Sequence, residues 1–200
     1  MWLMLRKFYL LIVLIGCCLH LQAQINDSVF SATILSSVSL FNASNQSDFQ
    51  LNISSEKPAL FIFLSPECPL CKNYSSILNT LYQQFNKDII FYSIIPGKAY
   101  SVKEVQDFQS TYQISFPVLI DSNKNLSNYL HATITPQVIL LDGKQHLLYK
   151  GAIDNWAVSL GKQRLKATED YLKDAIEQSL QHQLITIKRT QAVGCKINDY

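Results

Sequence analysis

Two cysteines, Cys68 and Cys71, have the most distinctive chemistry in this chain. They belong to the sequence Cys-Pro-Leu-Cys, which follows the apolar run 59–64 and begins a segment with helical periodicity. At the start of a helix, backbone N–H groups create a partly positive environment that favours a thiolate. The spacing therefore predicts dithiol–disulfide chemistry. In this chemistry Cys68 is the nucleophile, and Cys71 is the thiol that resolves a mixed disulfide.

The surroundings of the two thiols are expected to differ. We expect Cys68 to be the more exposed thiol and to have the lower pKa, because it lies at the helix start. Cys71, one turn further on, is expected to be more buried. Glu67 directly precedes Cys68, and a carboxylate beside a thiolate opposes its formation. We therefore expect Glu67 to cancel part of the benefit of the helix start.

Metal binding is the main alternative use of such a cysteine pair. A structural zinc site needs four ligands, and the sequence has neither a second Cys-x-x-Cys pair nor closely spaced paired histidines. A copper site built from two cysteines and a histidine would need His131, which lies in an expected short helix. A surface or helix-capping role suits His131 better than ligation. The sequence therefore favours redox chemistry and predicts no metal ligand.

The N-terminus has the pattern of an export signal. The basic pair Arg6-Lys7 precedes the apolar segment 8–15, which is too short for a comfortable membrane span. Two processing routes fit. We favour a signal peptide of residues 1–23, and the alternative is lipoprotein processing that leaves a lipid anchor on Cys17. Either route takes the protein out of the cytosol, to the bacterial periplasm or cell envelope, where disulfides persist.

Composition describes an ordinary globular protein. The chain has 200 residues, of which 48% are hydrophobic and 16% charged. Arg6 and Lys7 account for the formal net charge of +2, so no basic patch remains to indicate a nucleic-acid partner. We expect a single domain over residues 24–183, followed by a C-terminal tail, 184–200, that carries Cys195.

Periodicity predicts a mixed α/β architecture. The run 59–64 fits a strand that is buried on both faces. The segment 69–85 has a helical apolar stripe made of Tyr74, Ile77, Leu78, Leu81 and Phe85. An N-terminal hairpin is expected from 33–41 and 48–53. Further strands are expected at 89–95, 116–120, 138–141 and 146–149, and further helices at 101–112, 126–130 and 162–182.

With these elements in order, the chain resembles the thioredoxin fold. More narrowly, it resembles the secreted redoxins that group TlpA/ResA-like proteins with AhpC/TSA relatives. The resemblance covers roughly residues 30–182, and the tail 192–197 is similar to the Gly-Cys ending of some secreted redoxins. The segments that carry the resemblance are 63–71, 116–121, 133–138 and 150–154.

The resemblance implies a fold and a site. The fold is a central mixed sheet flanked by helices, with an N-terminal strand extension and a C-terminal tail. Pro136 would be a cis-proline facing the cysteine pair, and Thr135 with Pro136 would shape a substrate-docking edge. Cys195 is either an idle thiol or a third redox thiol that the tail delivers to Cys68 or Cys71.

The function implied is that of an exported thiol–disulfide oxidoreductase. It needs no organic cofactor, because the Cys68–Cys71 pair carries the electrons. Its partners would be protein disulfides or dithiols and a thiol–disulfide electron donor. Two alternatives remain: a peroxiredoxin-like antioxidant peroxidase, and a non-enzymatic redoxin module that binds a metal or a partner. Ser65, three residues before Cys68, favours the peroxidase, whereas the absence of arginine between Arg6 and Arg164 opposes it.

Overall fold

The computed structural model describes residues 28–53 and 56–197 of the chain. The expected export signal, 1–23, and the alternative lipid anchor at Cys17 therefore lie outside the described residues. Within the described ranges, no helix combines the length and the apolar character needed to cross a bilayer.

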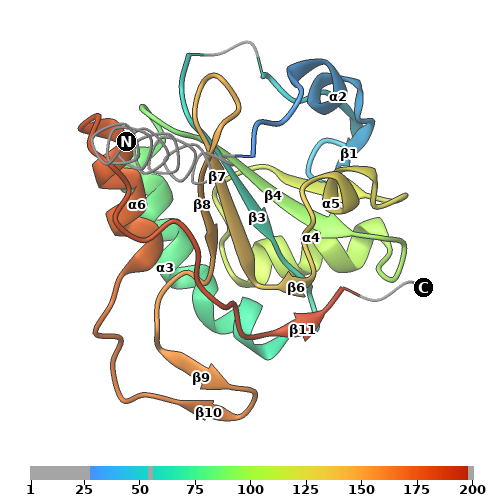
Figure 1. The fold of residues 1–200 in the computed structure, drawn as a ribbon. Coiled ribbons are helices and arrows are strands. Elements are labelled where there is room, and N and C mark those ends of the chain that lie inside the picture. The colour runs from blue at the N-terminus through green and yellow to red at the C-terminus, as the bar shows by residue number, and fades with distance from the viewer. Residues whose placement is uncertain (1–27, 54–55, 198–200) are drawn as a thin grey trace, which may run out of the picture.

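A seven-stranded mixed sheet forms the centre of the molecule (Figure 1), in the order β2-β1-β5-β4-β3-β7-β8. The three inner strands β5, β4 and β3 are parallel, and the remaining neighbours pair antiparallel. This is the mixed sheet that the sequence predicts. The strands are β1 (Leu40–Asn42), β2 (Ser47–Phe49), β3 (Ala59–Phe63), β4 (Ile90–Pro96), β5 (Val118–Asp121), β7 (Gln137–Leu141) and β8 (Leu147–Gly151).

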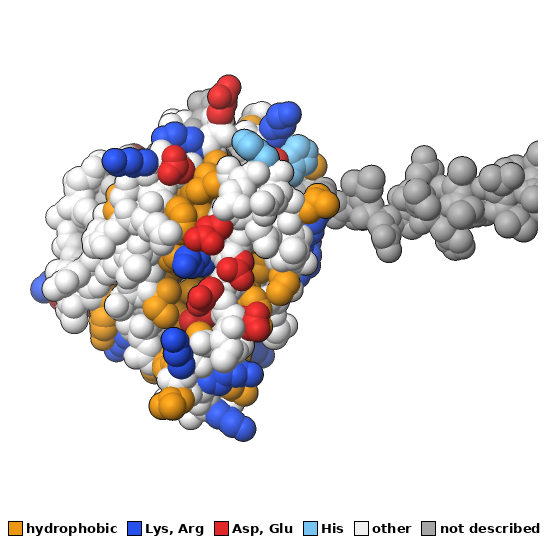
Figure 2. All heavy atoms as spheres, turned by 90° about the vertical axis from the view of Figure 1, so that its left-hand side faces the viewer, with side chains coloured by type: hydrophobic (Ala, Val, Ile, Leu, Met, Phe, Trp, Pro, Cys, Tyr) orange, Lys and Arg blue, Asp and Glu red, His pale blue; other side chains and the backbone are white. Residues whose placement is uncertain are grey.

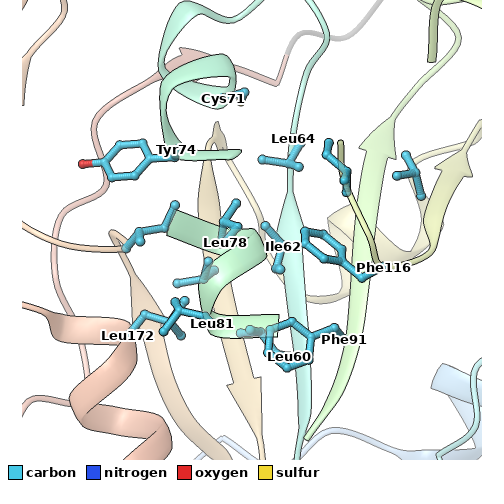
Figure 3. Packing of buried hydrophobic residues seen from close by; sticks show 14 of the residues in the cluster. Leu60, Ile62, Leu64, Cys71, Tyr74, Leu78, Leu81, Phe91, Phe116 and Leu172 are labelled. Carbon is cyan, nitrogen blue, oxygen red and sulfur yellow. The ribbon is translucent and has the colours of Figure 1, made fainter. Parts of the chain in front are cut away.

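Strand β3 is buried on both faces, as its continuous apolar sequence predicts. Alternate side chains enter two separate hydrophobic clusters, because successive residues of a strand point to opposite faces. Leu60 and Ile62 pack with α3 (Pro69–Phe85), as Figure 3 shows, whereas Phe61 and Phe63 pack on the opposite face of the sheet. The strand is thus fixed on both sides immediately before the cysteine pair.

Helices cover both faces of the sheet. Helix α3 shares its cluster with α4 (Val102–Thr111) and α6 (Tyr171–Leu180), and the other cluster includes α2 (Ala32–Ser37) and α5 (Asn125–Tyr129). The expected helix 101–112 is confirmed, and the capping box between Ser101 and Glu104 explains its start. In α3 most of the predicted stripe is buried, but Ile77 is 41% exposed.

The expected N-terminal hairpin is only partly right. Strands β1 and β2 do form an antiparallel pair, but residues 33–37 belong to helix α2 instead of a strand. The Ser31 side chain caps this helix by accepting a hydrogen bond from the Ile34 N–H at 3.4 Å. Only Leu35 is buried in the helix. With one buried residue in so short a segment, the apolar pattern is too weak to distinguish a helix from the alternating pattern of a strand.

The expected helix 162–182 is wrong in its first half. Residues 157–163 form a hairpin of β9 (Ala157–Ser159) and β10 (Lys162–Gln163), and α6 begins only at Tyr171. Gly161, with φ of +75°, makes the turn between the two strands. Leu165, which falls within the expected helix, is fully exposed. The apolar periodicity is real only from Leu172 onward.

The C-terminal segment returns to the sheet after α6. Thr190 hydrogen-bonds the Lys150 carbonyl at the edge of β8, and Ala192 is buried. The segment then forms β11 (Cys195–Lys196), which pairs antiparallel with β6 (Ile134–Thr135), just before Pro136 (Figure 1). The tail is therefore brought to the loop that the resemblance marks as the docking edge.

The inward face of α3 gives a test of the packing. Leu78 is fully buried and its neighbour Ile77 is 41% exposed. We expect Leu78→Ala to lower the free energy of unfolding by about 2–5 kcal/mol, because it leaves a cavity beneath α3. Ile77→Ala is the matched control and should cost less than about 1 kcal/mol. Denaturant unfolding measures both, and equal losses would contradict the helix register.

Candidate active site

Cys68 is the N-cap residue of α3, and Pro69 is the first residue of the helix. Strand β3 leads directly into this position through a turn in which the Cys68 N–H bonds the Ser65 carbonyl at 3.2 Å. Proline suits the first turn of a helix, where its missing N–H costs no intrahelical hydrogen bond. The sequence therefore fixes the Cys68 sulfur at the end of a buried strand and over the N-terminus of a helix.

Cys68 is the more exposed thiol of the pair, as expected, but only by a small margin, because both thiols are buried. Cys68 is 2% exposed and Cys71 is 0% exposed. The cause is the loop before β7 and the C-terminal tail, which cover the Cys68 sulfur. The Cys68 Sγ lies 3.1 Å from the Thr135 carbonyl oxygen, to which it donates a hydrogen bond only when protonated, and the Cys195 Sγ donates to the Cys68 Sγ at 2.8 Å.

The five residues marked by sequence as site candidates meet at this point. Thr135 precedes a cis peptide bond to Pro136, as the resemblance implies. Thr135 also pairs with Cys195 in the β6–β11 ladder, and its hydroxyl donates to the Cys195 carbonyl at 3.4 Å. Cys71 lies behind Cys68, and its sulfur accepts a hydrogen bond from the Ser65 N–H at 3.3 Å.

The pKa of Cys68 is lowered to about 5. The main cause is a hydrogen bond from the Cys71 thiol, which stabilises the thiolate, and the Cys195 thiol adds a second. Burial acts in the opposite direction. The backbone N–H groups of Cys71 and Cys195 also favour the ionised sulfur. Glu67, by contrast, is exposed and is not among the groups that shift this pKa, so its expected opposition is not found.

The other two thiols are held in the protonated form. Burial raises the pKa of Cys71 well above its usual value, and its hydrogen bond and charge interaction with Cys68 raise it further. Burial and the same two interactions with Cys68 raise the pKa of Cys195 to about 12. One thiolate thus accepts hydrogen bonds from two thiols, and burial together with the thiolate keeps each of these thiols protonated.

Sequence analysis missed the buried carboxylate of Asp154. It lies against Tyr74, which is one helical turn beyond Cys71 on α3. The Tyr74 hydroxyl donates to Asp154 at 2.5 Å, and the Trp156 N–H donates to the same carboxylate at 2.8 Å. Burial, followed by the hydrogen bond to Asp154 and then the charge of Asp154, raises the pKa of Tyr74 above its usual value. Tyr74 was visible in the sequence only as part of an apolar stripe, and nothing local marked Asp154 as its partner.

Two hollows adjoin the site. One, of about 200 Å³, lies between the Cys68 turn and the tail, and Ser65, Glu67, Tyr100, Thr135 and Lys196 contribute to its wall. The other, of about 600 Å³, lies between α3 and the start of α6 and includes Tyr74, Ile77 and Trp156. On the face that carries α6, apolar side chains and carboxylates lie side by side (Figure 2).

Among the residues that the structure describes, no group of three or more His, Cys, Asp or Glu side chains is arranged to hold a metal ion. His131, the histidine weighed for copper, is exposed and follows α5 in a left-handed conformation, with φ of +54°. Its carbonyl accepts a hydrogen bond from the Lys150 ammonium at 2.6 Å. The geometry therefore gives His131 a place in the turn after α5.

Comparison with known proteins identifies the class of this fold. A family model described as AhpC/TSA family matches residues 34–150. An uncharacterized conserved protein from Geobacillus kaustophilus superposes with a TM-score of 0.76 at 18% identity, over 88% of this chain and 94% of that one. A comparison with curated proteins found no match.

Two structures with described activities share the fold at lower similarity. A secreted disulfide oxidoreductase from Mycobacterium tuberculosis, homologous to E. coli DsbE, has a TM-score of 0.51 at 20% identity, over 58% of this chain and 84% of that one. The thioredoxin domain of a thiol-disulfide oxidoreductase from Bacteroides vulgatus has a TM-score of 0.53 at 13% identity, over 78% and 96%. The architecture is thioredoxin-like, as the sequence predicts.

The hydrogen bonds to the Cys68 thiolate can be tested by titration. The thiolate should appear, by its ultraviolet absorbance, as the pH rises through about 5 in the reduced protein. Cys195→Ala should raise this midpoint by about one unit, because a hydrogen bond to a charged group contributes roughly 1.5–3 kcal/mol, part of which is offset by relieved burial. Cys71→Ala should raise it more, since Cys71 is the larger cause.

Glu67→Gln is the matched control for this titration. Because Glu67 is exposed and does not contribute to the pKa of Cys68, the midpoint should not move. A midpoint that shifts with Glu67→Gln but not with Cys195→Ala would contradict the assignment of donors.

Proposed function

This chain belongs to the AhpC/TSA family, and we propose that it is an exported thiol–disulfide oxidoreductase whose redox centre is the Cys68–Cys71 pair. One observation carries the proposal. The Cys68 sulfur, at the N-terminus of α3, lies 3.1 Å from the carbonyl of Thr135, the residue that precedes the cis-proline Pro136. A nucleophilic thiol and a peptide edge that can hold a substrate backbone are thus adjacent.

The first step is attack by Cys68. Its low pKa keeps it ionised at neutral pH, and the thiolate is the species that attacks a disulfide. The Cys68 sulfur bonds to one sulfur of the substrate disulfide, whose S–S bond breaks, and the other substrate sulfur leaves as a thiolate. The result is a mixed disulfide between Cys68 and the substrate.

Cys71 completes the exchange. Two of the causes that raise its pKa, the hydrogen bond and the charge interaction with Cys68, disappear once Cys68 is part of a neutral disulfide. Burial remains, so Cys71 becomes more acidic without becoming freely ionised. Its thiolate then attacks the Cys68 sulfur and releases the second substrate thiol, leaving the Cys68–Cys71 disulfide. The same steps in reverse oxidise a dithiol.

The docking edge is assigned to Thr135 and Pro136. The Thr135 carbonyl faces the Cys68 sulfur, and β6 has an edge that accepts an antiparallel strand, since β11 pairs with it in this structure. A substrate segment that forms the same pairing would hold its cysteine beside Cys68. Backbone pairing of this kind accepts many sequences, which suits an enzyme with protein disulfides as substrates.

The proposed location is the bacterial periplasm or cell envelope. Its support is the N-terminal sequence pattern of Arg6-Lys7 and the apolar segment 8–15, with cleavage after residue 23 or lipidation of Cys17 as the two routes. In such a compartment, protein disulfides persist and a dithiol centre has substrates. Its partners there are protein disulfides or dithiols and a thiol–disulfide electron donor.

Peroxide reduction has weaker support. The Ser65 hydroxyl, which gave the peroxidase alternative its basis, forms a hydrogen bond of 2.8 Å with the Tyr100 hydroxyl. No cation is among the described groups that lower the pKa of Cys68, whereas a peroxidatic thiolate needs a cation that also holds the peroxide. The nearest stabilising groups are instead thiols, which suit disulfide exchange.

Substrate trapping tests the proposed roles. Wild-type protein supplied with dithiothreitol should accelerate the reduction of insulin disulfides, and Cys68→Ser should abolish the acceleration. Cys71→Ser/Cys195→Ser, which lacks both thiols next to Cys68, should accumulate mixed disulfides with added disulfide peptides, and Cys68→Ser should not, because only Cys68 attacks first.

Two parallel measurements address the alternatives. Consumption of hydrogen peroxide by the same preparations, faster than insulin reduction, would favour the peroxidase. A stoichiometric metal in the reduced, purified protein would favour the binding module. Trapped species on Cys71 in Cys68→Ser would reverse the two roles.

A further inference from the structure

The tail supplies a third thiol to the redox centre. The Cys195 Sγ is 2.8 Å from the Cys68 Sγ, although 127 positions separate the two residues in the sequence. A disulfide bond is about 2 Å long, so the two sulfurs need to approach by less than about 1 Å to form one. Cys68 therefore has two sulfur neighbours, Cys71 on its own helix and Cys195 on β11.

The position of Cys195 is set by backbone pairing. Cys195 pairs with Thr135 and Lys196 with Ile134, and the Ile197 N–H bonds the Thr133 carbonyl at 3.0 Å. Gly194 lies so close to Thr135 that a Cβ at this residue would collide with the Thr135 carbonyl. The close approach of β11 to β6 therefore requires glycine at this position.

A second anchor holds the tail upstream. The Thr190 hydroxyl bonds the Tyr149 hydroxyl at 2.5 Å and accepts from the Ala152 N–H at 2.9 Å. The Thr190 N–H bonds the Lys150 carbonyl, and Ala192 is 3% exposed. Only a few residues therefore separate a fixed point on the β8 edge from Cys195. Such a short connection keeps the local concentration of the Cys195 thiol at Cys68 high.

We propose that Cys195 is a third redox-active thiol that forms a disulfide with Cys68, in competition with Cys71. The inference rests on the proposed function, because it takes Cys68 to be the nucleophile. Strand β11 lies on the β6 edge in the place assigned above to a substrate strand, with its cysteine where a substrate cysteine would be. The tail is thus an intramolecular substrate of its own active site.

The exchange balances without an external oxidant. Starting from the Cys68–Cys71 disulfide, the Cys195 thiolate attacks the Cys68 sulfur, and the bond from Cys68 to Cys71 breaks. Cys71 leaves as a thiolate and takes up the proton that Cys195 gave up. Starting from a mixed disulfide on Cys68, Cys195 attacks the same sulfur and the bound thiol leaves. In both cases the number of disulfides is unchanged.

The charge on Cys68 determines when Cys195 reacts. In the reduced protein, burial and the neighbouring thiolate raise the pKa of Cys195 to about 12, so it remains a hydrogen-bond donor. Once Cys68 is in a disulfide, the charge interaction disappears and Cys195 becomes easier to ionise. Cys195 also retains more exposure to solvent than Cys71 and so has the easier route for proton loss.

The test uses the full chain with Cys17→Ser and Cys18→Ser in every variant, so that only the three thiols of the centre react. Reduced Cys71→Ser protein is mixed with one equivalent of dithiobisnitrobenzoate, which releases a coloured thiolate at each exchange. Closure of a Cys68–Cys195 disulfide should release two equivalents of colour per reagent molecule and leave no adduct on the intact chain. Peptide mapping should then find Cys68 linked to Cys195.

The control Cys71→Ser/Cys195→Ser should release one equivalent and retain the adduct on Cys68. If Cys71→Ser also retains a stable adduct on Cys68, with Cys195 still alkylated by iodoacetamide, the inference is overturned and the proposed function stands. If Cys68 does not react in either variant, the proposed nucleophile is wrong as well, and the two failures are therefore distinguishable.

A second pair of variants tests the delivery by β11. Gly194→Ala keeps the thiol but introduces a Cβ that collides with Thr135. In the Cys71→Ser background it should slow the release of the second equivalent about tenfold or more, because reactive groups displaced by about 1 Å lose most of their proximity. Lys196→Ala, an exposed side chain on the same strand, is the matched control and should leave the rate unchanged. Equal rates in both variants would overturn the role of the strand.

Discussion

The Cys68 sulfur lies almost out of contact with solvent, yet its pKa is lowered to about 5, and no cationic side chain is among the described groups that lower it. Burial alone would raise its pKa, so the thiolate depends on hydrogen-bond donors held against it. These donors are the thiols of Cys71 and Cys195 and their backbone N–H groups. The ionisation of the Cys68 sulfur therefore depends on the arrangement of α3, β6 and the tail.

This dependence links the oxidation state of the centre to its hydrogen bonds. A thiolate on Cys68 keeps both neighbouring thiols protonated, and the protonated thiols in turn stabilise the thiolate. Any disulfide at Cys68 removes the charge, and with it two of the causes that raise the pKa of both donors, while burial remains. Under the proposed mechanism, attack by Cys68 thus prepares the next attack on Cys68. Loss of the Cys68 charge lowers the pKa of both neighbouring thiols at once, although burial still opposes the ionisation of Cys71.

The strand before the cysteine pair and the helix after it could be predicted from sequence because their signals are local. An apolar run in 59–64 and the Pro69 start of a stripe in 69–85 each specify one element without reference to the rest of the chain. The position of Thr135 and Pro136 beside the cysteine pair was predicted from the resemblance alone, since nothing in their sequence spacing points to Cys68. The structure then brought it within hydrogen-bonding distance of the cysteine sulfur.

The predictions that were wrong or missing also have physical causes. The helix over 32–37 and the hairpin over 157–163 depend on a side-chain cap and on a single glycine turn, which override weak apolar periodicity. The burial of Cys68 was missed because its cover comes from residues far away in sequence. Asp154 was missed for the same reason, since its partner Tyr74 lies on another element.

The tail also limits access to the docking edge. Strand β11 occupies β6, so under the proposed function a substrate strand has to displace it before it can pair with Thr135. The ladder is only two residues long with a further bond from Ile197, and each hydrogen bond contributes about 0.5–1.5 kcal/mol net. Displacing β11 therefore costs little net free energy, because an incoming strand forms equivalent hydrogen bonds.

What distinguishes the tail from a substrate is the anchor at Thr190. When β11 leaves the edge, the bonds from Thr190 to Tyr149 and Ala152 do not depend on it, so the tail remains tethered beside the site. Rebinding is then intramolecular and competes continuously with any docked partner. A substrate that pairs weakly with β6 loses this competition, whereas one that forms a longer ladder or a mixed disulfide wins it. Under the proposed function, the tail thereby favours partners that hold the edge long enough for Cys68 to react.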